Sequence, residues 1–144
     1  MVRYFDSSIM LAGILGQKPQ SLMASLWDTA EIRLSSTLAK IECLIGVRRA
    51  GTLQDLAPGG PWCMERIHLL EAYLEGLDCR RIDDDILDII RRNVSLSNCR
   101  SLDAIHIATA LYFKPYHDEP IEIVTLDGRM RETAVKAGFA VLPA

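Results

Sequence analysis

The chain has 144 residues, of which 49% are hydrophobic, and its formal net charge is −3. This length suits one folded unit with a sizeable core, so we treat residues 1–144 as a single domain. The negative charge argues against a protein that simply coats nucleic acid. Because the sequence shows no run of 18 or more apolar residues and no leader-like N-terminal pattern, we expect a cytoplasmic protein without a membrane segment.

Segments with strand-like and helix-like patterns alternate along the chain. Apolar runs predict strands at residues 2–5, 31–34, 77–81, 121–125 and 139–142. Apolar residues at helical spacing predict helices at residues 37–50, 62–74, 84–94, 101–112 and 128–137, with two shorter helices between residues 7 and 29. Such alternation implies a parallel sheet covered on both faces, so the predicted fold is a three-layer α/β/α arrangement.

Three conspicuous features have ordinary structural explanations. The acidic run Asp83 to Asp85 falls where a helix begins, and acids are favoured there by the helix dipole, so we exclude it from the site. The stretch 51–62, rich in Gly and Pro, predicts a surface connection. Four cysteines are spread along the chain: Cys43, Cys63, Cys79 and Cys99. They form no C-x-x-C pair and have no histidine pair nearby, which indicates reduced packing residues and no zinc site.

Two acids follow predicted strands. Asp6 ends the first apolar run, in VRYFDSSIML, and Asp127 comes two residues after the fourth predicted strand, in VTLDGRM. Either acid taken alone is well explained as a helix cap, because Asp is strongly preferred at that position. In α/β folds, however, ligands bind beyond the carboxyl ends of the strands, and both acids are predicted to lie there.

Two further acids fall on predicted helices. Glu42 lies within an apolar stripe of its helix, with Leu38 at i−4 and Ile45 at i+3. Asp103 also projects from a core-facing side of its helix. Burying a lone carboxylate is costly, so each of these acids needs a partner. His106 is close enough in sequence to contact Asp103, although a lone histidine on a helix is more often a packed or capping residue.

Four carboxylates in one pocket repel one another unless a cation neutralises them. Oxygen ligands without a thiolate select Mg²⁺ or Mn²⁺ over zinc. A carboxylate-held Mg²⁺ points to phosphate chemistry, in which the ion activates a water and stabilises charge on the phosphoryl oxygens. If the strands that carry Asp6 and Asp127 are neighbours, the four acids therefore predict a metal-dependent site for a phosphate ester.

Together these motifs resemble a known family. The segments DSS, IECLIG, RSLDAIHIATA and VTLDGRMRETAVKAGFAVL are similar to the PIN domain, specifically to the VapC-like ribonuclease toxins of toxin–antitoxin pairs, and the resemblance covers nearly the whole chain. It implies a five-stranded parallel sheet between helices. It further implies Mg²⁺- or Mn²⁺-dependent cleavage of a phosphodiester bond in structured RNA, such as a tRNA or a ribosomal RNA loop. The expected partners are an antitoxin and a second copy of the chain, in a homodimer or a heterotetramer or larger assembly.

The resemblance also implies roles for individual residues. The expected metal-binding and catalytic acids are Asp6, Glu42, Asp103 and Asp127. We expect Ser7 and Thr125 to orient carboxylates or water from outside the ligand set. Arg100, three residues before the third acid, is expected to pair with a phosphate or a carboxylate. Ser8 is expected to serve the start of the helix.

Other phosphate-handling proteins share this architecture. A phosphorylation-receiver domain would have paired acids after its first strand and a lysine after its last, and this chain has neither. A haloacid-dehalogenase-type phosphatase needs a second Asp where Ser8 stands. A non-catalytic module with the same fold is disfavoured because unpaired acids in a pocket are destabilising. That module, and a PIN nuclease that processes RNA without an antitoxin, stay open as alternatives.

Overall fold

The computed structural model describes residues 1–17 and 20–144. Its strands are β1 (Val2–Phe5), β2 (Ile32–Ser36), β3 (Asp78–Arg80), β4 (Ile121–Val124) and β5 (Ala140–Leu142). Its helices are α1 (Ser7–Ile14), α2 (Gln20–Asp28), α3 (Thr37–Leu53), α4 (Pro61–Glu75), α5 (Asp84–Arg92), α6 (Ser101–Phe113) and α7 (Gly128–Lys136). Two 3₁₀ turns, η1 (Val94–Asn98) and η2 (Lys114–Tyr116), flank α6.

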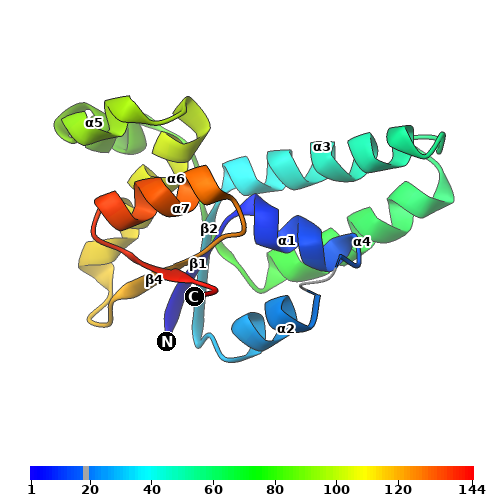
Figure 1. The fold of residues 1–144 in the computed structure, drawn as a ribbon, viewed down its shortest axis with the longest axis horizontal. Helices are drawn as coiled ribbons and strands as arrows, with labels where there is room; N and C mark the ends of the chain where they lie inside the picture. The colour runs from blue at the N-terminus through cyan, green and yellow to red at the C-terminus, as the bar shows by residue number, and fades with distance from the viewer. Residues whose placement is uncertain (18–19) are drawn as a thin grey trace.

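The five strands form one parallel sheet in the order β3-β2-β1-β4-β5. Val2 of β1 pairs with Ile32 on one side and with Ile121 on the other, so β1 is the central strand. The chain order changes direction between β1 and β4, and ligands of open α/β sheets bind at such a point, beyond the carboxyl ends of the strands. The predicted three-layer α/β/α fold with five parallel strands is confirmed, and Figure 1 shows helices on both sides of the sheet.

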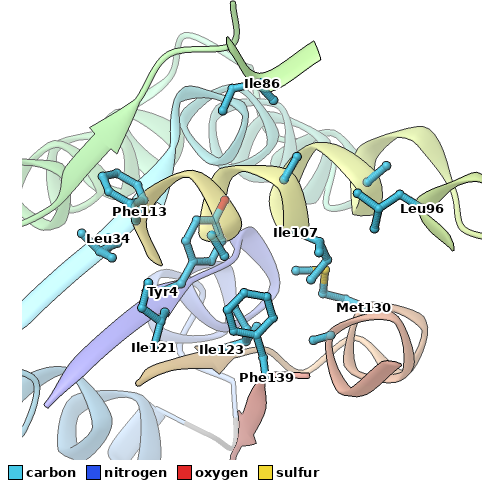
Figure 2. Close-up of a cluster of buried hydrophobic side chains, with 14 of the residues drawn as sticks. Tyr4, Leu34, Ile86, Leu96, Ile107, Phe113, Ile121, Ile123, Met130 and Phe139 are labelled. Carbon is cyan, nitrogen blue, oxygen red and sulfur yellow. The ribbon is translucent and has the colours of Figure 1, made fainter. Parts of the chain in front are cut away.

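Side chains of β1 alternate between two hydrophobic cores, one on each face of the sheet, as the strand period of two requires. Val2 and Tyr4 belong to the core covered by α5, α6 and α7. Figure 2 shows this core, with Tyr4 between the sheet and α6. Phe5 belongs to the other core, which α1, α2, α3 and α4 cover. Because β1 is buried on both sides, its carboxyl end is held rigidly at the edge of the sheet.

Helices α3 and α4 run side by side and extend beyond the sheet (Figure 1). The segment between them, residues 54–60, is the predicted surface connection, although residues 51–53 still belong to α3 and Pro61 already begins α4. The two helices approach closely at Gly51, where an added Cβ would lie 2.6 Å from the Sγ atom of Cys63. This contact explains why a residue without a side chain stands in the last turns of α3.

Several boundaries differ from the prediction for physical reasons. Strand β2 continues through Ser35 and Ser36, which are both fully buried. The hydroxyl of Ser35 donates to the carbonyl of Phe5 at 2.6 Å, and Ser36 caps α3 by accepting from the amide of Leu38 at 3.0 Å. These hydrogen bonds satisfy polar groups that an apolar pattern cannot anticipate. Helix α5 ends two residues earlier than predicted, and η1 follows it.

The acidic run Asp83 to Asp85 and the four cysteines were excluded from the predicted site, and the structure shows the contacts that they make. Asp83 caps α5 by accepting from the amide of Asp85 at 3.1 Å. All four cysteines are free, with Cys43 and Cys63 buried and the other two half-buried. In the described part of the chain, no helix is both long and apolar enough to cross a membrane.

Candidate active site

The four predicted acids meet at the carboxyl edge of β1 and β4. They come from four different elements: Asp6 follows β1, Glu42 lies on α3, Asp103 on α6, and Asp127 precedes α7. All four line one small pocket of about 120 Å³. The remaining residues that line it are Ser7, Ser8, Arg100, Leu102 and His106. The condition set by the sequence, that the strands carrying Asp6 and Asp127 be neighbours, is met because β1 pairs directly with β4.

Asp6 is buried, with 4% of its surface exposed, and two hydroxyl groups donate to its carboxylate. Its Oδ1 atom accepts from the Ser8 amide at 3.0 Å, the Ser8 hydroxyl at 2.6 Å and the Ile9 amide at 3.4 Å. Its Oδ2 atom accepts from the Thr125 hydroxyl at 2.5 Å. Burial raises the pKa of Asp6, and the hydrogen bonds from Ser8 and Thr125 partly offset that rise. Asp6 is therefore both the cap of α1 and a wall of the pocket.

The two serines after Asp6 divide their roles differently from the prediction. The Ser8 hydroxyl donates to Asp6 and accepts from the Leu126 amide at 2.9 Å, so it joins the end of β1 to the segment after β4. The expectation that Ser8 serves chiefly the helix start is therefore wrong. Ser7 lines the pocket, as expected, and its backbone carbonyl accepts from the Cys43 thiol at 3.8 Å.

Thr125 lies between two of the acids and is fully buried. Its hydroxyl donates to Asp6 and accepts from the amide of Asp127 at 3.0 Å. Asp127 in turn caps α7, because its Oδ1 atom accepts from the amides of Arg129 at 2.8 Å and Met130 at 3.3 Å. One hydroxyl group thus fixes the carboxylate of Asp6 and the backbone of Asp127 relative to each other.

Arg100 supplies positive charge to the other side of the pocket. Its Nε and Nη2 atoms donate to the two oxygens of Asp103 at 2.8 and 3.1 Å, and Nη2 also donates to Asp127 at 2.8 Å. This bidentate geometry with Asp103 is the strong form of an arginine–carboxylate pair. Burial opposes the ionisation of Asp127, but hydrogen bonds from Arg100 and from two backbone amides outweigh it and lower the pKa of that carboxyl. Of the two partners considered for Arg100, the structure displays the carboxylate.

Glu42 faces the pocket from α3 and is held by a histidine. Its Oε1 atom lies 2.7 Å from Nε2 of His106, whose ring is buried and whose Nδ1 atom lies 2.7 Å from the Tyr4 hydroxyl. The apolar-stripe interpretation of Glu42 is correct for Leu38, which is buried, and wrong for Ile45, which is 48% exposed. The carboxylate instead stands at the margin of the buried face of α3, with a quarter of its side chain exposed.

The sequence of the chain matches the PIN domain family over residues 3–136. The chain belongs to the PIN domain family. Ribonuclease VapC47 of Mycobacterium tuberculosis (strain CDC 1551 / Oshkosh) is 30% identical to it over 141 residues, which cover 94% of this chain and 92% of that protein. The chain is therefore a VapC-like PIN domain, as its motifs predicted.

A solved structure shows the same fold at much lower sequence identity. A chain in the crystal structure of VapBC2 from Rickettsia felis, bound to a DNA fragment from their promoter, aligns with a TM-score of 0.66 and 11% identity. The alignment covers 98% of this PIN domain and 97% of the Rickettsia chain. This likeness supports the α/β/α architecture over the full length compared.

The donor set of this PIN domain suits a hard divalent cation. Carboxylate and hydroxyl oxygens line the pocket, and Mg²⁺ and Mn²⁺ prefer such ligands. Among residues 1–17 and 20–144, no three acidic, histidine or cysteine side chains already stand close enough to form a ready ligand cluster. Arg100 instead supplies the positive charge beside Asp103 and Asp127. A cation that enters must therefore compete with Arg100 for these two carboxylates.

Proposed function

We propose that this PIN domain is a Mg²⁺- or Mn²⁺-dependent endoribonuclease that acts as the toxin of a toxin–antitoxin pair. The observation that carries the proposal is the meeting of four carboxylates from four separate elements in one pocket. Helix capping accounts for Asp6 and Asp127 one at a time, but it does not account for the gathering of four acids in one place, where like charges repel. The similarity to a ribonuclease of the VapC group supports the nuclease role.

The residues of the pocket would divide the work as follows. Asp6, Glu42, Asp103 and Asp127 would hold the cation, which when bound supplies a Lewis acid for water activation and for charge on the phosphoryl oxygens. Thr125 and Ser8 donate to Asp6 and keep its carboxylate oriented. Arg100 has a planar fork that fits phosphate oxygens as well as carboxylates, so it can pair with the phosphate of the substrate.

A second hollow beside the acids supports a nucleic-acid substrate. It has a volume of about 440 Å³ and shares Arg100 and Asp103 with the acidic pocket. Arg129 at the start of α7 lines it as well and adds a second guanidinium group. We propose that a nucleotide next to the cleaved bond occupies this hollow. We propose structured RNA, such as a tRNA or a ribosomal RNA loop, as the substrate, with salt-sensitive binding.

The proposed partners follow from the toxin role. We propose an antitoxin that binds this chain, a homodimer or larger assembly, and a cytoplasmic location. The similarity to VapC47 and to a chain of the VapBC2 structure favours this role over RNA processing without an antitoxin.

The test compares wild type with Asp103→Asn in two assays. Induced expression should arrest bacterial growth for wild type and not for the variant, and purified wild type should cleave total bacterial RNA with Mg²⁺ or Mn²⁺ but not with EDTA. Asp118→Asn is the matched control, because Asp118 is an exposed acid outside the pocket. Equal growth and equal cleavage for wild type and Asp103→Asn would refute the proposal.

A further inference from the structure

Three polar side chains form a chain of hydrogen bonds that reaches the acidic pocket from the core. Tyr4 on β1 is fully buried, and its hydroxyl lies 2.7 Å from Nδ1 of His106 on α6. The opposite ring nitrogen, Nε2, lies 2.7 Å from Oε1 of Glu42 on α3. Figure 2 shows Tyr4 beneath α6, with its hydroxyl oxygen pointing toward that helix. The three residues thus connect the sheet with helices from both outer layers.

The direction of these hydrogen bonds follows from the chemistry of the groups. An ionised Glu42 carboxylate has no proton to give, so Nε2 of His106 must carry the hydrogen between them. In a neutral ring Nδ1 then accepts from the Tyr4 hydroxyl, and in a charged ring it donates to the same oxygen. In both cases Glu42 receives an N–H donor from a ring that Tyr4 holds from behind.

The fixed ring matters because little else holds Glu42. Among the described residues, the Glu42 side chain has one hydrogen-bond partner, which is His106. A glutamate has three rotatable side-chain bonds, and a partly exposed one samples many rotamers unless it is held. The hydrogen bond uses Oε1 and leaves Oε2 available to the pocket.

The positions of the two supporting residues add to the argument. Tyr4 lies on β1, two residues before Asp6, which follows the end of that strand, and His106 lies about one helical turn after Asp103. The elements that fix Asp6 and Asp103 therefore also fix Glu42, although α3 is a separate element. This arrangement holds three of the four acids at set positions relative to one another.

We propose that His106, supported by Tyr4, is a positioning residue that orients Glu42 for a divalent cation. The inference rests on the proposed function, because it requires that the acids bind such a cation. Partners that orient metal-binding side chains in this way typically change metal affinity by about 10- to 100-fold when they are removed.

The experiment measures Mn²⁺ affinity by titration calorimetry on the purified chain, with no RNA present. His106→Leu keeps the volume of the ring but has no donor, and we expect its Kd to be about 10- to 100-fold higher than that of wild type. His106→Gln places an amide N–H near the position of Nε2, and we expect it to retain most of the affinity. His68→Leu is the control, because His68 is an exposed histidine on α4.

A double-mutant cycle separates positioning from packing. If His106 acts through Glu42, His106→Leu has little further effect on Mn²⁺ affinity in a Glu42→Gln chain. An equal loss in both backgrounds would show a packing role and overturn the inference. If His106→Leu does not fold, Tyr4→Phe removes a single oxygen from the same chain of bonds, and an unchanged Mn²⁺ Kd in that variant would equally overturn it.

The outcomes also distinguish this inference from the proposed function. If wild type binds Mn²⁺ and cleaves RNA while His106→Leu binds Mn²⁺ as tightly, the inference fails and the proposed function stands. If wild type neither binds Mn²⁺ nor cleaves RNA, both fail.

Discussion

The hydroxyl of Thr125 offers the most direct test of how the pocket is held together. Thr125→Val preserves the shape of the side chain and removes one oxygen. The variant loses the donor to Asp6 at 2.5 Å and the acceptor for the Asp127 amide at 3.0 Å. We expect a less stable protein in the absence of metal, although the packing is unchanged.

The size of the effect follows from these two contacts. A hydrogen bond to a charged group contributes about 1.5–3 kcal/mol to stability, and an amide left without a partner costs about 1 kcal/mol where water can partly reach it. The free energy of unfolding should therefore fall by about 3 kcal/mol at neutral pH. Thr109→Val is the matched control: Thr109 is equally buried, but its hydroxyl donates to the carbonyl of Ile105 in its own helix, so about 1 kcal/mol is expected.

The loss should depend on pH with a definite sign. The pKa of Asp6 is raised above its ordinary value of 3.8, chiefly by burial. Because the folded state binds this proton more tightly than the unfolded state does, protonation of Asp6 stabilises the fold. This contribution is fully present below pH 3.8 and is lost as the pH rises through the folded-state pKa. Thr125→Val removes a hydrogen bond that lowers this pKa, so it raises the pKa further. The difference between wild type and variant is smallest near pH 4 and grows until Asp6 is ionised in both proteins.

Urea unfolding with EDTA, followed by circular dichroism at several pH values between 4 and 8, measures this difference. Because both proteins share every other titrating group, the difference between them isolates the region around Asp6. A loss no greater than that of Thr109→Val, or a loss of equal size at pH 4 and pH 8, would refute the reasoning.

Three further predictions concern other parts of the molecule. Burial raises the pKa of the Cys43 thiol to about 12, so iodoacetamide at pH 8 should leave it unmodified in the folded protein and label it in urea, as mass spectrometry would show; equal labelling in both would contradict this. Gly51→Ala would place a methyl group 2.6 Å from the Sγ atom of Cys63, so the free energy of unfolding in urea should fall by about 1–3 kcal/mol. The additional substitution Cys63→Ala should restore it, and a double variant that stays as unstable as Gly51→Ala would exclude this contact as the cause. Arg129→Ala should raise KM for RNA cleavage with little change in kcat, whereas Arg91→Ala on α5 should not, and an unchanged KM for Arg129→Ala would exclude a role for the second hollow.

Local patterns predicted the strands and the acids that follow them, whereas the meeting of the acids also required that β1 and β4 be neighbours in the sheet. Apolar runs located the five strands, and the positions of Asp6 and Asp127 after two of those strands placed them at one edge. The hydrogen bonds around these acids could not be predicted from local patterns. The partners of His106 lie 102 and 64 residues away in the sequence, and Ser8 reaches Leu126 across 118 residues. Pairings of that kind depend on the order of strands in the sheet.

The same pattern explains the errors. Ser8 stands in the first turn of a helix, where a hydroxyl is ordinarily a cap, and nothing local reveals that β4 ends beside it. The stripe around Glu42 contains real apolar residues, but α3 turns Ile41 and Ile45 toward solvent and buries Cys43 and Val47. Periodicity shows that a helix has an apolar side, yet several such sides compete on a helix as rich in apolar residues as α3.

The central position of β1 in the sheet also determines how much of the chain must be synthesised before the acidic pocket can form. The ribosome makes β1 first, but the neighbour that completes its pairing is β4, at residues 121–124. The fourth acid follows at Asp127, so a nascent chain shorter than this contains Asp6, Glu42 and Asp103 without a finished pocket. A chain that stops before Asp127 therefore lacks one of the four acids that line the pocket, together with helix α7, which Asp127 caps.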